Sequence, residues 1–177
     1  MSEKAKAGSP AYHQVAFVVR DVDEAVRHWA DDLGIGPWSV WTMRPPALIE
    51  TMYHGQPAAF GLKHALAWSG TMQFELVQPL EGPSIFADQL DAIGEGPNHI
   101  GMVVSDHAAA VADYIARGFV PLQCARGFGA SKDGAFAYFQ PPHDISTIVE
   151  LISPPTVRFD PEYTYPDTTP PVAGEQA

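Results

Sequence analysis

The chain has 177 residues, of which 46% are hydrophobic, and a formal net charge of -11 at pH 7. That size suffices for one compact domain or for two small half-domains that share a core. The negative charge argues against nucleic acid and anionic membrane as partners, because both are bound through Lys and Arg. No stretch reaches the roughly 20 apolar residues of a membrane span, and residues 1–10 lack the apolar core of a signal peptide, so we expect a cytoplasmic protein.

Residues 1–10 are small and polar and are interpreted as a flexible N-terminal arm. The segment 11–80 is interpreted as a first β-α-β-β-β module. Its first strand opens at His13, after which Asp21 can begin a helix that Gly34 ends. Three further strands are expected at about 37–43, 58–68 and 71–78.

A second module is predicted by the same order of elements in residues 98–154. Residues 81–97 have apolar positions at helical spacing and predict a linker helix before it. His99 opens a strand, and Asp106 begins a helix. Further strands are expected at about 120–125, 134–140 and 146–152. The Pro-rich segment 155–177 is interpreted as a C-terminal arm, either docked on the molecule or disordered.

A repeated phrase marks the last strand of each half. Glu-Leu-Val-Gln-Pro at 75–79 recurs as Glu-Leu-Ile-Ser-Pro at 150–154. Both halves therefore read β-α-β-β-β, which indicates an α+β fold in which two such units pair their sheets around one cavity. Two histidines and two glutamates stand at corresponding points of the halves, and these are the candidate metal ligands: His13, Glu75, His99 and Glu150.

Each of these residues has an ordinary alternative, because single histidines and glutamates on strands are often surface or core residues. Glu75 and Glu150, however, lie between apolar neighbours in strands whose burial would make an unpaired carboxylate costly. We therefore favour one divalent metal cation as cofactor. Histidine nitrogen with carboxylate oxygen suits zinc, iron, cobalt, nickel, manganese or magnesium.

The strings around these positions resemble the vicinal oxygen chelate superfamily, which includes glyoxalases, methylmalonyl-CoA epimerases, extradiol dioxygenases and resistance proteins for fosfomycin or bleomycin. The resemblance covers residues 11–154 and is nearest to the epimerase branch. It is carried by HQVAFVV at 13–19, MQFELVQPL at 72–80, NHIGMVV at 98–104 and IVELI at 148–152. It implies an open, curved, mixed sheet around a central metal cavity, commonly in a homodimer, with the four candidate ligands at the family's metal positions.

The same resemblance implies an enzyme that chelates neighbouring oxygens of a small-molecule substrate and eases removal of a proton beside a carbonyl. Epimerases of this kind place an acid on the strand before the first metal glutamate, but residues 57–60 contain none. His64 is the candidate replacement base, with a core or interface histidine as the alternative. Tyr53 and His54, in the preceding loop, are further candidates, and Glu150 is counted as catalytic as well as metal-binding.

Three functions fit these observations. The first is a metal-dependent lyase, isomerase or epimerase that stabilises an enolate-type intermediate. The second is a ring-cleaving dioxygenase of extradiol type that uses iron, although Glu75 would fill a position that this chemistry needs. The third is a binding protein that sequesters a small apolar molecule. Dense aromatic residues near the expected cavity favour a bulky apolar or aromatic substrate.

Overall fold

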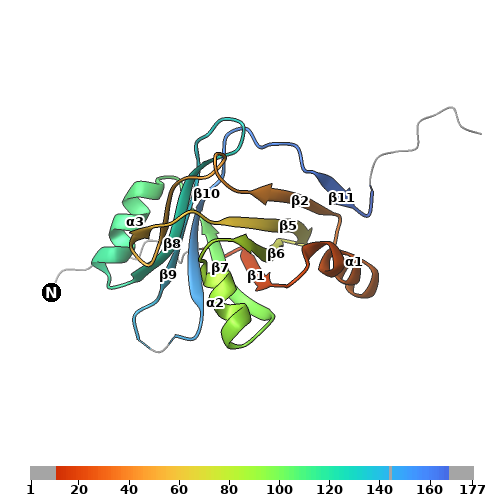
Figure 1. The fold of residues 1–177 in the computed structure, drawn as a ribbon, viewed down its shortest axis with the longest axis horizontal. Coiled ribbons are helices and arrows are strands. Elements are labelled where there is room, and N and C mark those ends of the chain that lie inside the picture. Colours follow the sequence, from red (N-terminus) through yellow and green to blue (C-terminus); the bar gives the residue numbers. More distant parts are fainter. Residues whose placement is uncertain (1–10, 144, 168–177) are drawn as a thin grey trace, which may run out of the picture.

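A computed structural model describes residues 11–143 and 145–167 (Figure 1). The first part of the chain forms β1 (Gln14–Val18), α1 (Val22–Leu33), β2 (Trp38–Met43), β3 (Ile49–Tyr53), β4 (Gln56–Pro57), β5 (Gly61–Ser69), β6 (Met72–Glu81) and α2 (Ile85–Ala92). The second part forms β7 (Gly96–Val103), α3 (His107–Ala116), β8 (Val120–Phe128), β9 (Gly134–Gln140), β10 (Ile148–Ser153) and β11 (Tyr163–Tyr165). None of the described helices is long and apolar enough to span a membrane.

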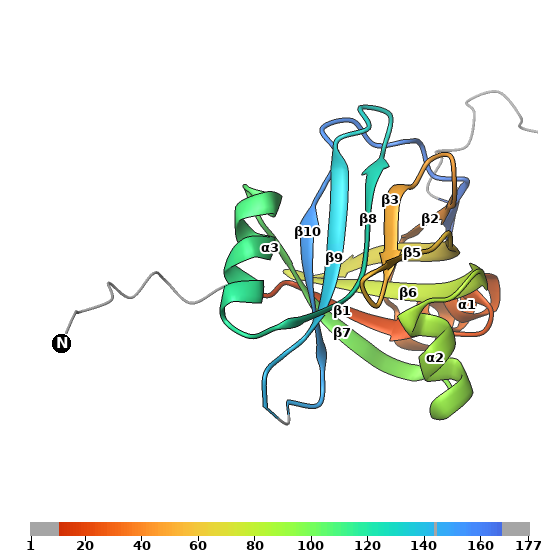
Figure 2. The same cartoon turned by 60° about the vertical axis from the view of Figure 1, so that its left-hand side comes forward.

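The strands form one open, mixed, 11-stranded sheet in the order β11-β2-β5-β6-β1-β7-β10-β9-β8-β3-β4. Within each module the first strand pairs in parallel with the last, as β1 does with β6 and β7 with β10. The modules join through the antiparallel pair β1–β7 at the centre. The predicted α+β fold with two tandem modules is therefore confirmed, and both modules lie within one chain (Figure 2).

Polar caps begin the module helices where the sequence places them. The Asp21 side chain accepts a hydrogen bond of 3.0 Å from the Glu24 amide at the start of α1, and Asp106 accepts one of 2.9 Å from Ala109 at the start of α3. Gly34, with a φ of 67°, ends α1. Each helix covers the outer face of its own module (Figure 1).

The linker helix α2 packs on a core that both modules share. It is shorter than the expected 81–97, because β7 already begins at Gly96. Its buried residue Phe86 lies in a cluster with Val18 and Phe60 of the first module and Phe136 of the second. This shared core fixes how the two halves of the sheet curve toward one another.

Two strand pairings of the fold were not predicted. The short hairpin of β3 and β4 leaves the first module and pairs with β8 of the second (Figure 2). Its turn places His54 and Gly55 at φ values of 46° and 76°, as two-residue hairpin turns require. In the Pro-rich tail, β11 pairs with β2, and we call residues 155–165 the C-terminal strap. The expected N-terminal arm 1–10 lies outside the described residues.

Candidate metal centre and active site

Three of the four candidate ligands meet at the centre of the sheet. Glu75 on β6, His99 on β7 and Glu150 on β10 are buried, and one ligand atom from each lies within 4.8 Å of the others. His99 Nε2 is 3.2 Å from Glu75 Oε2 and 3.2 Å from Glu150 Oε2. The last strand of each module thus places one carboxylate beside the same imidazole, that of His99.

Small residues on the central strands leave room for this cluster. Ala16 on β1 is the register partner of both Glu75 and His99, and Gly101 on β7 is the partner of Glu150. A Cβ at Gly101 would lie 2.2 Å from Gln14 Oε1. A side chain at this glycine would therefore displace the Gln14 amide.

A chain of amides orients the His99 ring. The Asn98 side-chain oxygen lies 2.8 Å from His99 Nδ1, and the Asn98 amide nitrogen donates to Gln89 Oε1 at 2.9 Å. Gln89, on α2, in turn donates to the Gly96 carbonyl at 3.1 Å. With the proton on Nδ1, the lone pair of Nε2 points at the two carboxylates, which is the tautomer that binds a metal.

His13, the fourth candidate ligand, lies outside the cluster. Its ring stacks against Trp68 at the cavity rim, with centroids 6.4 Å apart, and its Nδ1 is 3.3 Å from the Ala11 carbonyl oxygen. The next residue, Gln14, is buried in the cavity wall and donates to Gln73 Oε1 at 3.1 Å. Successive side chains of a strand point to opposite faces. An alignment that is wrong by one residue therefore selects His13 at the rim in place of Gln14 in the cavity wall.

The positions of the two helix caps indicate that Gln14, and not His13, corresponds to His99. Asp21 and Asp106 cap the two module helices, and counting seven residues back from each gives Gln14 (21 − 7) and His99 (106 − 7). Aligning the modules on the first histidine of each strand instead selects His13. Gln14 was therefore missed as the residue equivalent to His99.

The chemistry of this cluster fits a divalent cation. The buried side-chain atoms without a hydrogen-bond partner in the described chain include Gln14 Oε1, Glu75 Oε2, His99 Nε2 and Glu150 Oε2. Gln14, Glu75 and Glu150 line one cavity, and His99 Nε2 lies beside both carboxylates. Buried polar atoms are normally paired, so these unpaired atoms indicate a missing partner. Three oxygens and one imidazole nitrogen form a donor set for a hard or borderline ion.

The charges of the two buried glutamates also favour a bound cation. Burial alone would raise the pKa of Glu75, but the neighbouring His64 and His99 side chains outweigh it and lower that pKa to about 2. Burial raises the pKa of Glu150 despite the opposing effect of His99. Glu150 is therefore the carboxylate whose burial is least compensated by its neighbours, and a bound cation would supply the missing positive charge.

His64 reaches the centre through Glu75. Its Nδ1 lies 2.8 Å from Glu75 Oε1, its side chain is 12% exposed, and its ring lines the cavity. Tyr53 and His54 lie elsewhere. The Tyr53 hydroxyl donates to Asp88 on α2 at 2.7 Å, and His54 Nε2 is 3.8 Å from the same carboxylate at the surface. Of the three candidate bases, only His64 lines the cavity.

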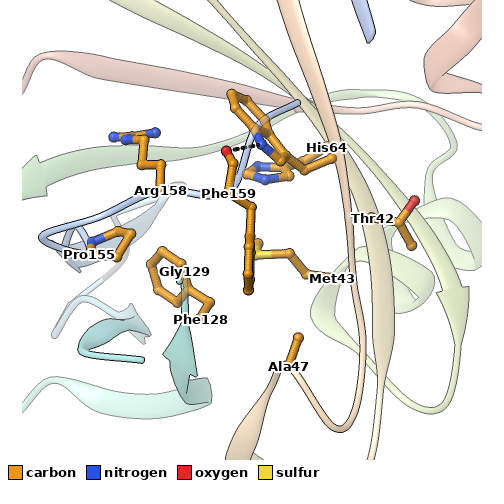
Figure 3. A pocket seen from close by; sticks show the side chains of 10 residues that line it. Thr42, Met43, Ala47, His64, Phe128, Gly129, Pro155, Arg158 and Phe159 are labelled. Carbon is orange, nitrogen blue, oxygen red and sulfur yellow. Dashed lines mark hydrogen bonds between the residues drawn. The ribbon is translucent and has the colours of Figure 1, made fainter. Parts of the chain in front are cut away.

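The metal-centre cavity has a volume of about 180 Å³ and opens beside a second, apolar pocket of about 80 Å³. Both hollows share Met43, His64, Phe128 and Arg158. Figure 3 shows the apolar pocket, with Arg158 and Pro155 on one side and His64 and Met43 on the other. A ligand can therefore extend from the metal centre into an aromatic pocket.

Residues 13–139 match the model of the Glyoxalase/Bleomycin resistance protein/Dioxygenase superfamily, and the chain belongs to this family. The fold and the paired glutamates on the last strands agree with the resemblance inferred from the sequence, which is confirmed. No match was found among the curated proteins.

Two solved structures illustrate the range of similar proteins. Methylmalonyl-CoA epimerase from Mycobacterium tuberculosis is 22% identical, with a TM-score of 0.55 over 81% of this chain and 87% of that one. A mutant of 4-hydroxymandelate synthase from Streptomyces coelicolor is 20% identical, with a TM-score of 0.57 over 86% of this chain and 40% of that one. At these identities the likeness is one of fold.

Proposed function

We propose that the chain is a metal-dependent enzyme of the lyase, isomerase or epimerase type, which moves a proton beside a carbonyl of a small molecule. Glu75, His99 and Glu150 hold one divalent cation, with Gln14 as the fourth ligand in place of His13. The observation that carries this proposal is the cluster of Glu75, His99 and Glu150 with unpartnered buried ligand atoms, beside the equally unpartnered Gln14 Oε1 in the cavity wall.

His64 is the proposed base. Glu75 Oε1 accepts from Nδ1, which leaves the Nε2 lone pair to take a proton from a ligand in the cavity. Glu75 then stabilises the resulting imidazolium across 2.8 Å, as the carboxylate of a catalytic triad does for its histidine. The bound cation supplies stabilisation of negative charge on a substrate oxygen.

The extradiol-type dioxygenase and the sequestering protein remain the alternatives. One histidine with two carboxylates and an amide differs from the two histidines and one carboxylate of the common iron site for oxygen activation. A sequestering protein has no need of a base held by a carboxylate. The homodimer and the cytoplasmic location inferred from the sequence stay predictions.

Metal content tests the ligand set. After loading with zinc and exhaustive dialysis, we expect one zinc per wild-type chain by elemental analysis and almost none in His99→Ala or Glu150→Ala. Gln14→Ala should weaken zinc binding by roughly 10-fold or more, because one of four ligands is lost. His13→Ala is the matched control and should retain zinc. Full occupancy in Glu150→Ala, or loss in His13→Ala alone, would contradict the assignment.

Proton exchange tests the base. In D₂O, zinc-loaded protein should speed deuterium uptake into the acetyl group of 4-acetylbenzoate, followed by NMR. His64→Gln should reduce this rate on the order of 100-fold or more while zinc content is unchanged. Tyr53→Phe and His54→Ala should exchange like the wild type. Exchange that survives His64→Gln would exclude His64, and oxygen uptake by iron-loaded protein with catechols would favour the dioxygenase.

A further inference from the structure

The C-terminal strap contributes Arg158 to the lining of the metal-centre cavity and is attached at both ends. Near its start, Thr156 N donates to Asp133 at 2.9 Å, and Val157 O accepts from Ala130 N at 2.9 Å in the loop between β8 and β9. At its other end, Glu162 N donates to the Val40 carbonyl of β2 at 2.8 Å. Between these attachments, Arg158 and Phe159 line the apolar pocket together with Trp41 of the first module and Phe128 of the second.

Arg158 and Phe159 of the strap, together with Pro155, line the apolar pocket. The Phe159 carbonyl accepts from Trp41 Nε1 at 3.0 Å, which fixes the strap against the first module (Figure 3). Arg158 lines the metal-centre cavity, the apolar pocket and a third hollow beside Trp68. Its side chain therefore stands where the three hollows meet.

Four of the eight Lys and Arg side chains in the described residues lie within 4 Å of a carboxylate, and Arg158 is the one of the other four that lines the metal-centre cavity. Lys63 is 2.6 Å from Asp23, Arg117 is 3.1 Å from Asp113, and other arginines lie within 4 Å of glutamates. No carboxylate pairs with Arg158 in residues 11–143 and 145–167, although the chain has 21 acidic residues. A guanidinium left unpaired at a cavity in so acidic a protein favours an anion from outside the chain.

The charge around the cavity supports the same conclusion. A divalent cation would offset the two negative charges of Glu75 and Glu150, so that Arg158 contributes the remaining positive charge. The surroundings are aromatic, with Trp41, Phe128 and Phe159 around the apolar pocket. A cavity of roughly 150 Å³ admits benzene, so hollows of about 180 and 80 Å³ suit one ring with short substituents.

We propose that the substrate is a small aromatic carboxylate whose ring lies against the strap and whose carboxylate binds Arg158. The metal end of this assignment rests on the proposed function, whereas the Arg158 end does not. The guanidinium can meet a carboxylate with two parallel hydrogen bonds, which fixes the ring's direction in the cavity. A coenzyme A thioester fits less well, because its several phosphates would need more than one unpaired cation at the entrance.

Two catechols that differ in one carboxylate test the proposal. Isothermal titration under anaerobic conditions would compare 3,4-dihydroxyphenylacetate with 4-methylcatechol on the zinc-loaded protein. We expect the acid to bind roughly 10-fold tighter, near the low end of the range for charge-assisted hydrogen bonds because Arg158 is exposed. Arg158→Ala should bring this ratio close to one, and Arg158→Lys should keep part of it. Arg126→Ala, which removes an exposed arginine paired with Glu50, is the matched control.

The outcomes separate the two proposals. If zinc removal leaves both affinities unchanged but the ratio still depends on Arg158, the metal proposal fails and the carboxylate site stands. A ratio near one in the wild type, or a ratio that survives Arg158→Ala, would overturn the carboxylate site. Coenzyme A binding more tightly than either catechol, and losing affinity in Arg158→Ala, would overturn it in favour of a phosphate ligand.

Discussion

Replacing Glu150 by glutamine tests two effects of this carboxylate. We expect it to lower the free energy of unfolding of the metal-free protein and to raise the affinity for the metal. Glu150 is 4% exposed and shares the His99 imidazole with Glu75, at 3.2 Å each. An unpaired buried polar group costs about 1 to 3 kcal/mol, and an uncompensated buried charge costs more. Glutamine keeps the size and one carbonyl oxygen without the charge. We expect metal-free Glu150→Gln to be more stable than metal-free wild type by about 1 kcal/mol, or roughly 2 to 4 °C in Tm.

Zinc should reverse this order. A ligand that binds only the folded state stabilises it by about 2.7 kcal/mol at 100 times its Kd, which is roughly 5 to 10 °C for a protein of this size. Glu150→Gln lacks one anionic ligand and should gain much less. Thermal unfolding of both proteins in chelator and in increasing zinc, at one pH, measures the crossing.

The refuting result is an unchanged order of stability. If the wild type is more stable than Glu150→Gln in chelator as well as in zinc, the carboxylate is not an uncompensated charge in the metal-free state. If the variant remains the more stable protein at saturating zinc, Glu150 is not a ligand. His13→Ala serves as the control and should shift with zinc as the wild type does.

Two further predictions concern the frame of the fold. Burial would raise the pKa of Asp23, but hydrogen bonds from Lys63 and a tyrosine outweigh it and lower that pKa. The contribution of Asp23 to the free energy of unfolding is therefore present above the unfolded pKa of about 4 and is lost as pH falls through the folded pKa. Acid unfolding of Asp23→Asn should therefore show less loss of stability below about pH 4, by under about 1 kcal/mol because the pair is partly exposed. Gly82→Ala places a Cβ 2.0 Å from the Ala59 carbonyl oxygen at a φ of 73°, and should lower the free energy of unfolding in denaturant by at least about 2 kcal/mol. Gly70→Ala, at a φ of 61° with open space around it, should lower it by about 1 kcal/mol. Equal losses in the two variants would contradict the steric explanation.

The duplicated modules could be predicted because their elements carry local signals. Asp21 and Asp106 cap helices, and the strands of both modules alternate or stay apolar over several residues. The hairpin of β3 and β4 carries no such signal, since its residues are largely exposed. Its partner β8 is distant in sequence, and such pairing follows from tertiary structure alone.

The candidate site depended on registers that the sequence defines only in part. Glu75 and Glu150 could be chosen from the repeated phrase, and the structure brings both to His99. The choice between His13 and Gln14 required the face of β1, which a single shift in alignment reverses. The contact between His64 and Glu75 was not visible either, because it joins neighbouring strands whose pairing sets the distance.

The metal centre lies on buried central strands, whereas the proposed carboxylate site lies at an exposed residue of the C-terminal strap. Glu75, His99 and Glu150 project from central strands, where a change disturbs a buried network. Arg158 lies on the strap and is exposed. A substitution there alters the ligand space without opening the core, so its effect on stability should be small. The strap therefore offers a means to change which anion is bound while the chelating centre is kept.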